Sequence, residues 1–206
     1  LFTNPGRVRI VDHVTNYGGV EPAAYMVCKR TELIRDALKR ESKVAWFDTD
    51  ILIRKGLAGF WELVKPDTLA VMVRPDKPAK MRFQAGVCAF GRGDAVAGMV
   101  DAWAAACARP AWWLDQQALY QCSEAAGVEV VALPKCYHDH GGNHSAGVPA
   151  AFDIASAVWH ARKMNLNNPD WSREFGQYLR AGKELIARGL RNQRLPGVIG
   201  TKKGKK

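Results

Sequence analysis

The chain has 206 residues, of which 48% are hydrophobic, a proportion typical of a globular protein long enough to bury one good core. No run approaches the ~20 apolar residues of a membrane span, and the N-terminus lacks a basic-then-apolar signal pattern. We therefore expect no transmembrane segment and a cytoplasmic protein. The five cysteines are an odd number without CxxC spacing, which argues against a zinc ribbon or a disulfide framework and indicates a reducing compartment.

The net charge of +10 is concentrated near the C-terminus. Residues 161–206 contain twelve Lys and Arg against three Asp and Glu, and the chain ends in TKKGKK. We expect a domain over residues 1–190 and a basic flexible tail over 191–206. The tail is interpreted as a solubility feature, and the alternative is attraction to a phosphate-rich partner. Because no RNA-binding motif or interleaved aromatic residues accompany the charge, we expect no specific nucleic acid partner.

Strand and helix signals alternate along the chain, which predicts an α/β domain. Thr31 is predicted to cap one helix and Asp94 another, whose apolar residues repeat at helical spacing. The expected strands cover residues 8–14, 44–47, 69–73, 83–90 and 128–133. The expected helices cover residues 31–38, 56–64, 94–107, the segment after Pro110 and about 171–188, with a Gly- and His-rich loop over 137–150.

The most informative stretch is KVAWFDTDILI, in which an apolar run delivers Asp48 and Asp50 one residue apart. Two unpaired carboxylates are costly to bury, so they are expected where a sheet ends or kinks. A divalent cation would take oxygen ligands from both and leave positions for a phosphorylated substrate. The structural alternative is a strand-to-turn junction in which Asp forms a turn or caps a helix.

Four motifs, in this order, resemble those of the GT-A-type nucleotide-sugar glycosyltransferases, a DxD-containing superfamily, and especially its retaining families. They are Asp48-Thr49-Asp50, FQAGVCAF at 83–90, LDQQAL at 114–119 and VWHARK at 158–163. The resemblance spans roughly residues 23–163 and implies a mixed sheet flanked by helices in a single domain. It also implies that a hexose passes from a nucleotide diphosphate sugar to a glycan, protein or lipid acceptor, with Mn²⁺ or Mg²⁺ as cofactor.

The resemblance implies roles for nine residues. The DxD aspartates and a late histidine would bind the metal ion, which neutralises the charge that develops on the departing diphosphate. The FQAG and DQ residues would shape the donor-sugar site, and two basic residues would contact the diphosphate. The nine are Asp48, Asp50 and His160 for the metal, Arg30, Gln84, Gly86 and Lys163 for the donor, and Asp115 and Gln116 for catalysis.

Several of these assignments have local alternatives. Gln84 stands where the family often has Asn, and Gly86 would allow the sugar to approach the backbone or would simply sit at a β-bulge. Asp115 would equally serve as a helix N-cap. His160 and Lys163 are three residues apart, one fewer than in the family's pattern.

Only 47 residues precede Asp48. We therefore expect the family's first nucleotide-binding unit to be short or absent, or the chain to be truncated at its N-terminus. A degenerate module that keeps the fold and has lost the donor pocket is the non-enzymatic alternative.

Two other chemistries remain open. A haloacid-dehalogenase-like phosphatase would use Asp48 as nucleophile and Asp50 as acid and base, although Leu52 stands where that family has Thr or Val. The loop YHDHGGNH offers an independent zinc-type site, because alternate residues of an extended segment face the same side. Its ligands would be His138, His140 and His144, with Asp139.

Overall fold

The computed structural model of the chain describes residues 22–141, 152–160, 172–177 and 180. The chain divides into two compact units. We call Val14–Asp48 with Ala58–Pro134 the sheet unit, and Leu1–His13, Thr49–Leu57 and Lys135–Lys206 the histidine unit. The strand expected over 8–14 and the tail over 191–206 lie outside the described residues, so the domain limits of 1–190 and 191–206 stay a prediction.

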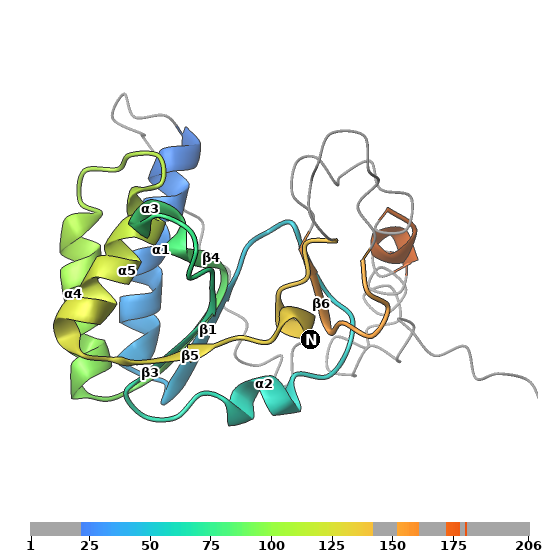
Figure 1. Ribbon diagram of the computed structural model, residues 1–206, viewed down its shortest axis with the longest axis horizontal. Helices are drawn as coiled ribbons and strands as arrows, with labels where there is room; N and C mark the ends of the chain where they lie inside the picture. The colour runs from blue at the N-terminus through green and yellow to red at the C-terminus, as the bar shows by residue number, and fades with distance from the viewer. Residues whose placement is uncertain (1–21, 142–151, 161–171, 178–179, 181–206) are drawn as a thin grey trace, which may run out of the picture. The chain divides into compact units, whose positions relative to one another are not determined.

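A four-stranded mixed sheet forms the framework of the sheet unit (Figure 1). Its strand order is β1-β4-β3-β5, with β4 antiparallel to both neighbours and β3 parallel to β5. The strands are β1 (Lys43–Phe47), β3 (Thr68–Val73), β4 (Phe83–Gly91) and β5 (Glu129–Ala132). The α/β class and the mixed sheet are therefore confirmed.

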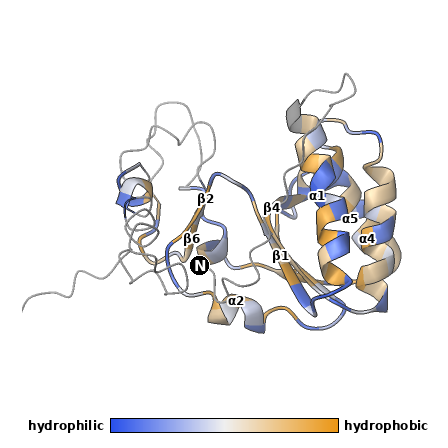
Figure 2. Ribbon diagram, turned by 180° about the vertical axis from the view of Figure 1, so that it is seen from behind, coloured by the Kyte–Doolittle hydropathy of each residue, from blue (hydrophilic) through white to orange (hydrophobic). Residues whose placement is uncertain are grey.

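Helices α1, α4 and α5 pack on one another, and α1 and α5 also contact the sheet (Figure 1). Figure 2 shows β1 and β4 as mostly hydrophobic, whereas α1 and α5 alternate between hydrophobic and hydrophilic residues. In the hydrophobic core of the sheet unit, the rings of Phe90 and Trp103 stack with their centroids 5.9 Å apart. The helices are α1 (Pro22–Leu38), α2 (Ala58–Glu62), α3 (Ala79–Arg82), α4 (Asp94–Ala106) and α5 (Leu114–Ala126). None of the helices in the described ranges is both long enough and apolar enough to cross a bilayer.

The helix starts differ from the predicted caps. Thr31 lies inside α1, where its hydroxyl donates to the Cys28 carbonyl at 2.9 Å. Asp94 is the first residue of α4, and the Val96 N–H is instead bound by the Asp67 carboxylate at 3.1 Å. The spacing of residues in the sequence did not predict these helix starts. The oxygen that caps α4 belongs to a loop distant in the sequence, and α1 begins before its apolar stripe.

A β-bulge interrupts the pairing of β4 with β3. Val71 pairs with Cys88, but the next residue, Met72, pairs with Gln84. Residues 85–87 are thus left out of this pairing, and the glycine of FQAG lies among them. The bulge alternative from the sequence is correct, and the bulge leaves carbonyl groups for partners outside β3.

The histidine unit contains a two-stranded antiparallel sheet of β2 (Ile51–Ile53) and β6 (Val158–His160). The buried side chains of Leu52 and Trp159 pack with Phe152 and Phe175. A short 3₁₀ helix, η2 (Lys135–Tyr137), precedes Asp139, which pairs with Trp159 as an isolated bridge. Three-residue strands carry too little periodicity to be recognised in a sequence, and β6 was not predicted.

Arg54 fixes the end of this small sheet. Its guanidinium carbon lies 3.7 Å from the centre of the Trp159 ring. Nη1 donates to the carbonyl groups of Ile154 and Ser156 at 3.1 and 3.3 Å, and Nε lies 3.6 Å from a Glu174 carboxylate oxygen. The charge of Arg54 is therefore engaged within the unit and is a structural feature of it.

Candidate functional site

Arg30 lies at the centre of a buried ion-pair cluster in the sheet unit. It projects from α1 and is 3% exposed. Its Nη1 donates to Asp48 Oδ1 at 3.2 Å and to the Ala85 carbonyl at 3.0 Å, while Nη2 donates to Asp115 Oδ2. One guanidinium thus joins the DTD, FQAG and DQ motifs, which are far apart in the sequence.

Asp48 follows the last residue of β1, at the strand end that the sequence predicted. Its N–H donates to the Gly86 carbonyl at 2.9 Å, so the bulged segment of β4 positions it. The indole N–H of Trp46 donates to Asp48 Oδ1 at 2.7 Å. Trp46 was not predicted, although residues two apart on a strand share a face and this spacing could have indicated it.

Asp115 is the second residue of α5 and is 3% exposed. The N-cap position belongs to Trp113, so the alternative role of Asp115 as N-cap is wrong. A carboxylate in the first turn of a helix is favoured by the helix dipole, and the Asp115 carbonyl also accepts the Trp103 indole N–H at 2.8 Å. Gln116 follows it as a half-buried residue.

The other residues near this cluster are also buried. Gln84 is 6% exposed, and Cys88 is fully buried in β4 with its thiol donating to the Ala85 carbonyl at 3.6 Å. Burial raises the pKa of the Cys88 thiol to about 12, while the positive charge of Arg30 acts in the opposite direction. All five cysteines carry free thiols, and three of them are buried while Cys122 and Cys136 are half-buried.

In the histidine unit, Asp50 and His160 lie in contact. Asp50 directly precedes β2, and the register of the small sheet places Ile51 opposite His160. As a result, His160 Nε2 lies 3.1 Å from Asp50 Oδ1. His160 is 7% exposed, so its imidazole is oriented by the sheet and is shielded from water.

Two further histidines surround His160. His138 Nε2 lies 2.7 Å from His160 Nδ1, and the His140 ring centre lies 4.4 Å from that of His138 and 4.6 Å from that of His160. The sequence grouped His138 and His140 with His144, which lies outside the described residues. The third imidazole that the structure brings to them is that of His160.

Asp139 was also considered as a metal ligand, but in the structure its carboxylate binds groups of the surrounding loop. Its carboxylate is fully buried and accepts hydrogen bonds from Gly141 N–H, Asp153 N–H and the Ser156 hydroxyl at 2.9, 2.8 and 2.9 Å. These bonds hold the loop that carries the histidines. Lys163, predicted for the diphosphate, lies outside the described residues.

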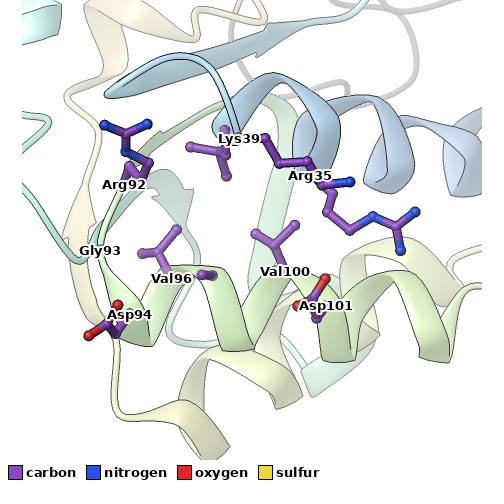
Figure 3. Close-up of a pocket in the computed structure, with 10 residues that line it drawn as sticks. Arg35, Lys39, Arg92, Gly93, Asp94, Val96, Val100 and Asp101 are labelled. Carbon is purple, nitrogen blue, oxygen red and sulfur yellow. The ribbon is translucent and has the colours of Figure 1, made fainter.

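A pocket of about 400 Å³ lies elsewhere in the sheet unit, between α1 and α4 (Figure 3). Arg35, Lys39 and Arg92 line it together with Asp94 and Asp101, so both signs of charge face it. It contains none of the nine predicted site residues. Its mixed lining does not indicate a ligand class.

The chain matches no known family model and no curated protein. Function is therefore inferred from the residues and their contacts.

Proposed function

We propose that this chain is a metal-dependent glycosyltransferase, which moves a hexose from a nucleotide diphosphate sugar to an acceptor. The observation that carries the proposal is the meeting of three sequence motifs at Arg30. Asp48, Ala85 and Asp115 come from separate segments, and the same guanidinium binds all three. A chance resemblance of short motifs would give no reason for these segments to converge.

The metal ligands are proposed to be Asp48, Asp50 and His160. Asp50 and His160 present a carboxylate oxygen and an imidazole nitrogen 3.1 Å apart, and Asp48 lies two residues before Asp50 in the chain. Carboxylates suit both Mg²⁺ and Mn²⁺, and the imidazole favours Mn²⁺ of the two. When bound, the ion would neutralise the negative charge of the diphosphate leaving group.

The remaining motif residues are proposed to bind and orient the donor sugar. Gln84 and Asp115 are buried, and Gly86 lies in the bulge, where the absence of a side chain lets a ligand approach the backbone. Arg30 holds the Asp115 carboxylate in one orientation, and Gln116 follows on the same turn of α5. Rigidly held acceptors and donors of this kind raise the rate by fixing the reacting atoms in place.

Thermal unfolding with nucleotides tests the proposal. The protein is melted with UDP, GDP and their sugars, each with and without Mn²⁺, as wild type and as Asp50→Asn. A ligand at a hundredfold excess over its dissociation constant adds about 2.7 kcal/mol to the free energy of unfolding. We expect a Mn²⁺-dependent rise in melting temperature that Asp50→Asn abolishes and the exposed-carboxylate control Asp76→Asn retains.

The competing functions give different results in the same experiment. A protein that shows no shift with any nucleotide, with or without Mn²⁺, would contradict the transferase and leave a module that has lost donor binding. Hydrolysis of a phosphate ester by the wild type, without consumption of any sugar nucleotide, would instead indicate the phosphatase. A shift that Asp50→Asn leaves intact would contradict the assigned metal ligands.

A further inference from the structure

His138, His140 and His160 of the histidine unit form a cluster, of which only His160 has a role in the proposed transferase. His138 and His160 are 1% and 7% exposed, and His140 is half-buried beside them. One nitrogen from each of the three rings lies within 4.8 Å of the others. We propose that these imidazoles bind one late transition-metal ion, such as Zn²⁺ or Co²⁺, at a site that shares only His160 with the proposed Mn²⁺ site and uses the opposite nitrogen of its ring.

The chemistry of the donor set selects this class of ion. Three neutral imidazoles are soft enough to prefer Zn²⁺, Co²⁺ or Ni²⁺ over Mg²⁺, Ca²⁺ or Mn²⁺, which prefer oxygen. Three protein ligands with a fourth position left for water is a common zinc arrangement. The His160 nitrogen used here is Nδ1, which faces His138, whereas Nε2 faces Asp50.

The distances permit binding with little movement. Two nitrogens on one tetrahedral zinc ion lie about 3.3 Å apart, given bonds of about 2.0–2.1 Å. His138 Nε2 and His160 Nδ1 are 2.7 Å apart, so the rings must separate by a few tenths of an ångström. In the neutral pair these two nitrogens share one proton, and binding requires His138 to carry its proton on Nδ1. His160 keeps its own proton on Nε2 while no Mn²⁺ is bound, because Nε2 is the nitrogen that faces Asp50 in the proposed Mn²⁺ site.

The surroundings support the ligands in the manner of a metal site. While no Mn²⁺ is bound, Asp50 accepts the outward N–H of His160, and a carboxylate behind a ligating histidine orients the ring and strengthens it as a ligand. Asp139 holds the loop between His138 and His140 through its three hydrogen bonds. The backbone of Asp139 also pairs with β6, through its N–H to the Val158 carbonyl and its carbonyl to the His160 N–H. The histidines are thus fixed relative to one another by the backbone.

Cobalt titration of the untagged, chelator-treated full chain tests the site. We expect one equivalent of Co²⁺ per chain with the visible absorption of a four-coordinate site, and its displacement by Zn²⁺. His140→Gln and His138→Gln should each weaken binding more than a hundredfold, since loss of an outer partner alone costs about 10–100-fold. His140 is half-buried, whereas His138 is buried, so His140→Gln should disturb the fold less than His138→Gln. Far-UV circular dichroism checks that both variants are folded.

Cys136→Ser is the matched control, because this half-buried thiol precedes the cluster in the chain and is itself a zinc-type donor. It should bind Co²⁺ as the wild type does. The assignment is overturned if the wild type binds no Co²⁺ or Zn²⁺, if His140→Gln binds as tightly as the wild type, or if Cys136→Ser loses binding. The Mn²⁺-dependent nucleotide shift should survive in His140→Gln, so the failure of one proposal is distinguishable from the failure of the other.

Discussion

Replacement of Arg30 by methionine should cost a large part of the stability of the sheet unit. The variant keeps most of the length of the side chain and removes the guanidinium that forms ion pairs with both Asp48 and Asp115. Breaking a buried pair by removing one partner costs about 3–5 kcal/mol. The Asp115 side chain is 4% exposed and would bear most of this cost, whereas that of Asp48 is 32% exposed and can turn toward water. We therefore expect Arg30→Met to lower the free energy of unfolding by about 3 kcal/mol.

Urea unfolding of a double-mutant cycle measures this interaction. The cycle contains Arg30→Met, Asp115→Leu and the double variant, with fluorescence and circular dichroism required to report the same transition. Removing both charges leaves only the partly exposed Asp48 carboxylate without Arg30, so the double variant should be more stable than Arg30→Met. Arg35→Met is the control on the same helix, because that side chain is 38% exposed and should change stability by less than about 0.5 kcal/mol.

Two results would refute the reasoning. A loss below about 1 kcal/mol in Arg30→Met would mean that the guanidinium does not stabilise the buried carboxylate of Asp115. A double variant whose loss equals the sum of the two single losses would mean that Arg30 and Asp115 do not interact.

Two further predictions concern β4. Because the pKa of the Cys88 thiol is raised from 9.0 to about 12, the unfolded chain loses this proton first, and stability should fall by about 1.4 kcal/mol per pH unit between these values. Urea titrations from about pH 8 to about pH 10.5 should show this fall in the wild type and a shallower one in Cys88→Ala, and parallel curves would contradict it. Gly91→Ala should destabilise by about 3 kcal/mol, because an added Cβ would lie 1.6 Å from the Lys65 carbonyl oxygen. The control Gly98→Ala, with nothing within 4 Å in a helix, should stabilise by about 0.5–1 kcal/mol, and equal effects at the two glycines would refute the close contact.

The elements that the sequence predicted well are those with strong local signals. The apolar runs became β1, β3, β4 and β5, and the helical spacing of the apolar residues after Asp94 became α4. The stretch after Pro110 became α5, with a start one residue before Asp115. These signals repeat several times within one element, so no tertiary information is needed to read them.

The contacts of the site could be predicted only in part. The expectation that Asp48 stands at a strand end followed from the cost of burying carboxylates, and it is confirmed. The pairing of His160 with Asp50 depends on two three-residue strands that are far apart in the sequence, and the pairing of Arg30 with Asp115 depends on the packing of two helices. Neither arrangement leaves a periodic trace in the sequence.

The charge of the Arg30 cluster bears on the role predicted for this residue. Within the described residues, one guanidinium faces the two carboxylates of Asp48 and Asp115, and this excess of negative charge favours a cation over a diphosphate. The guanidinium already binds three acceptors, and its Nε is buried without a hydrogen-bond partner among the described residues. A positioning role is therefore favoured over the predicted contact with the donor phosphates. If Arg30 has a positioning role, Arg30→Met lowers stability, and the affinity of the folded variant for UDP or GDP with Mn²⁺ falls no further than in Asp115→Leu. A much larger loss of nucleotide affinity in Arg30→Met than in Asp115→Leu would instead favour a direct contact with the donor phosphates.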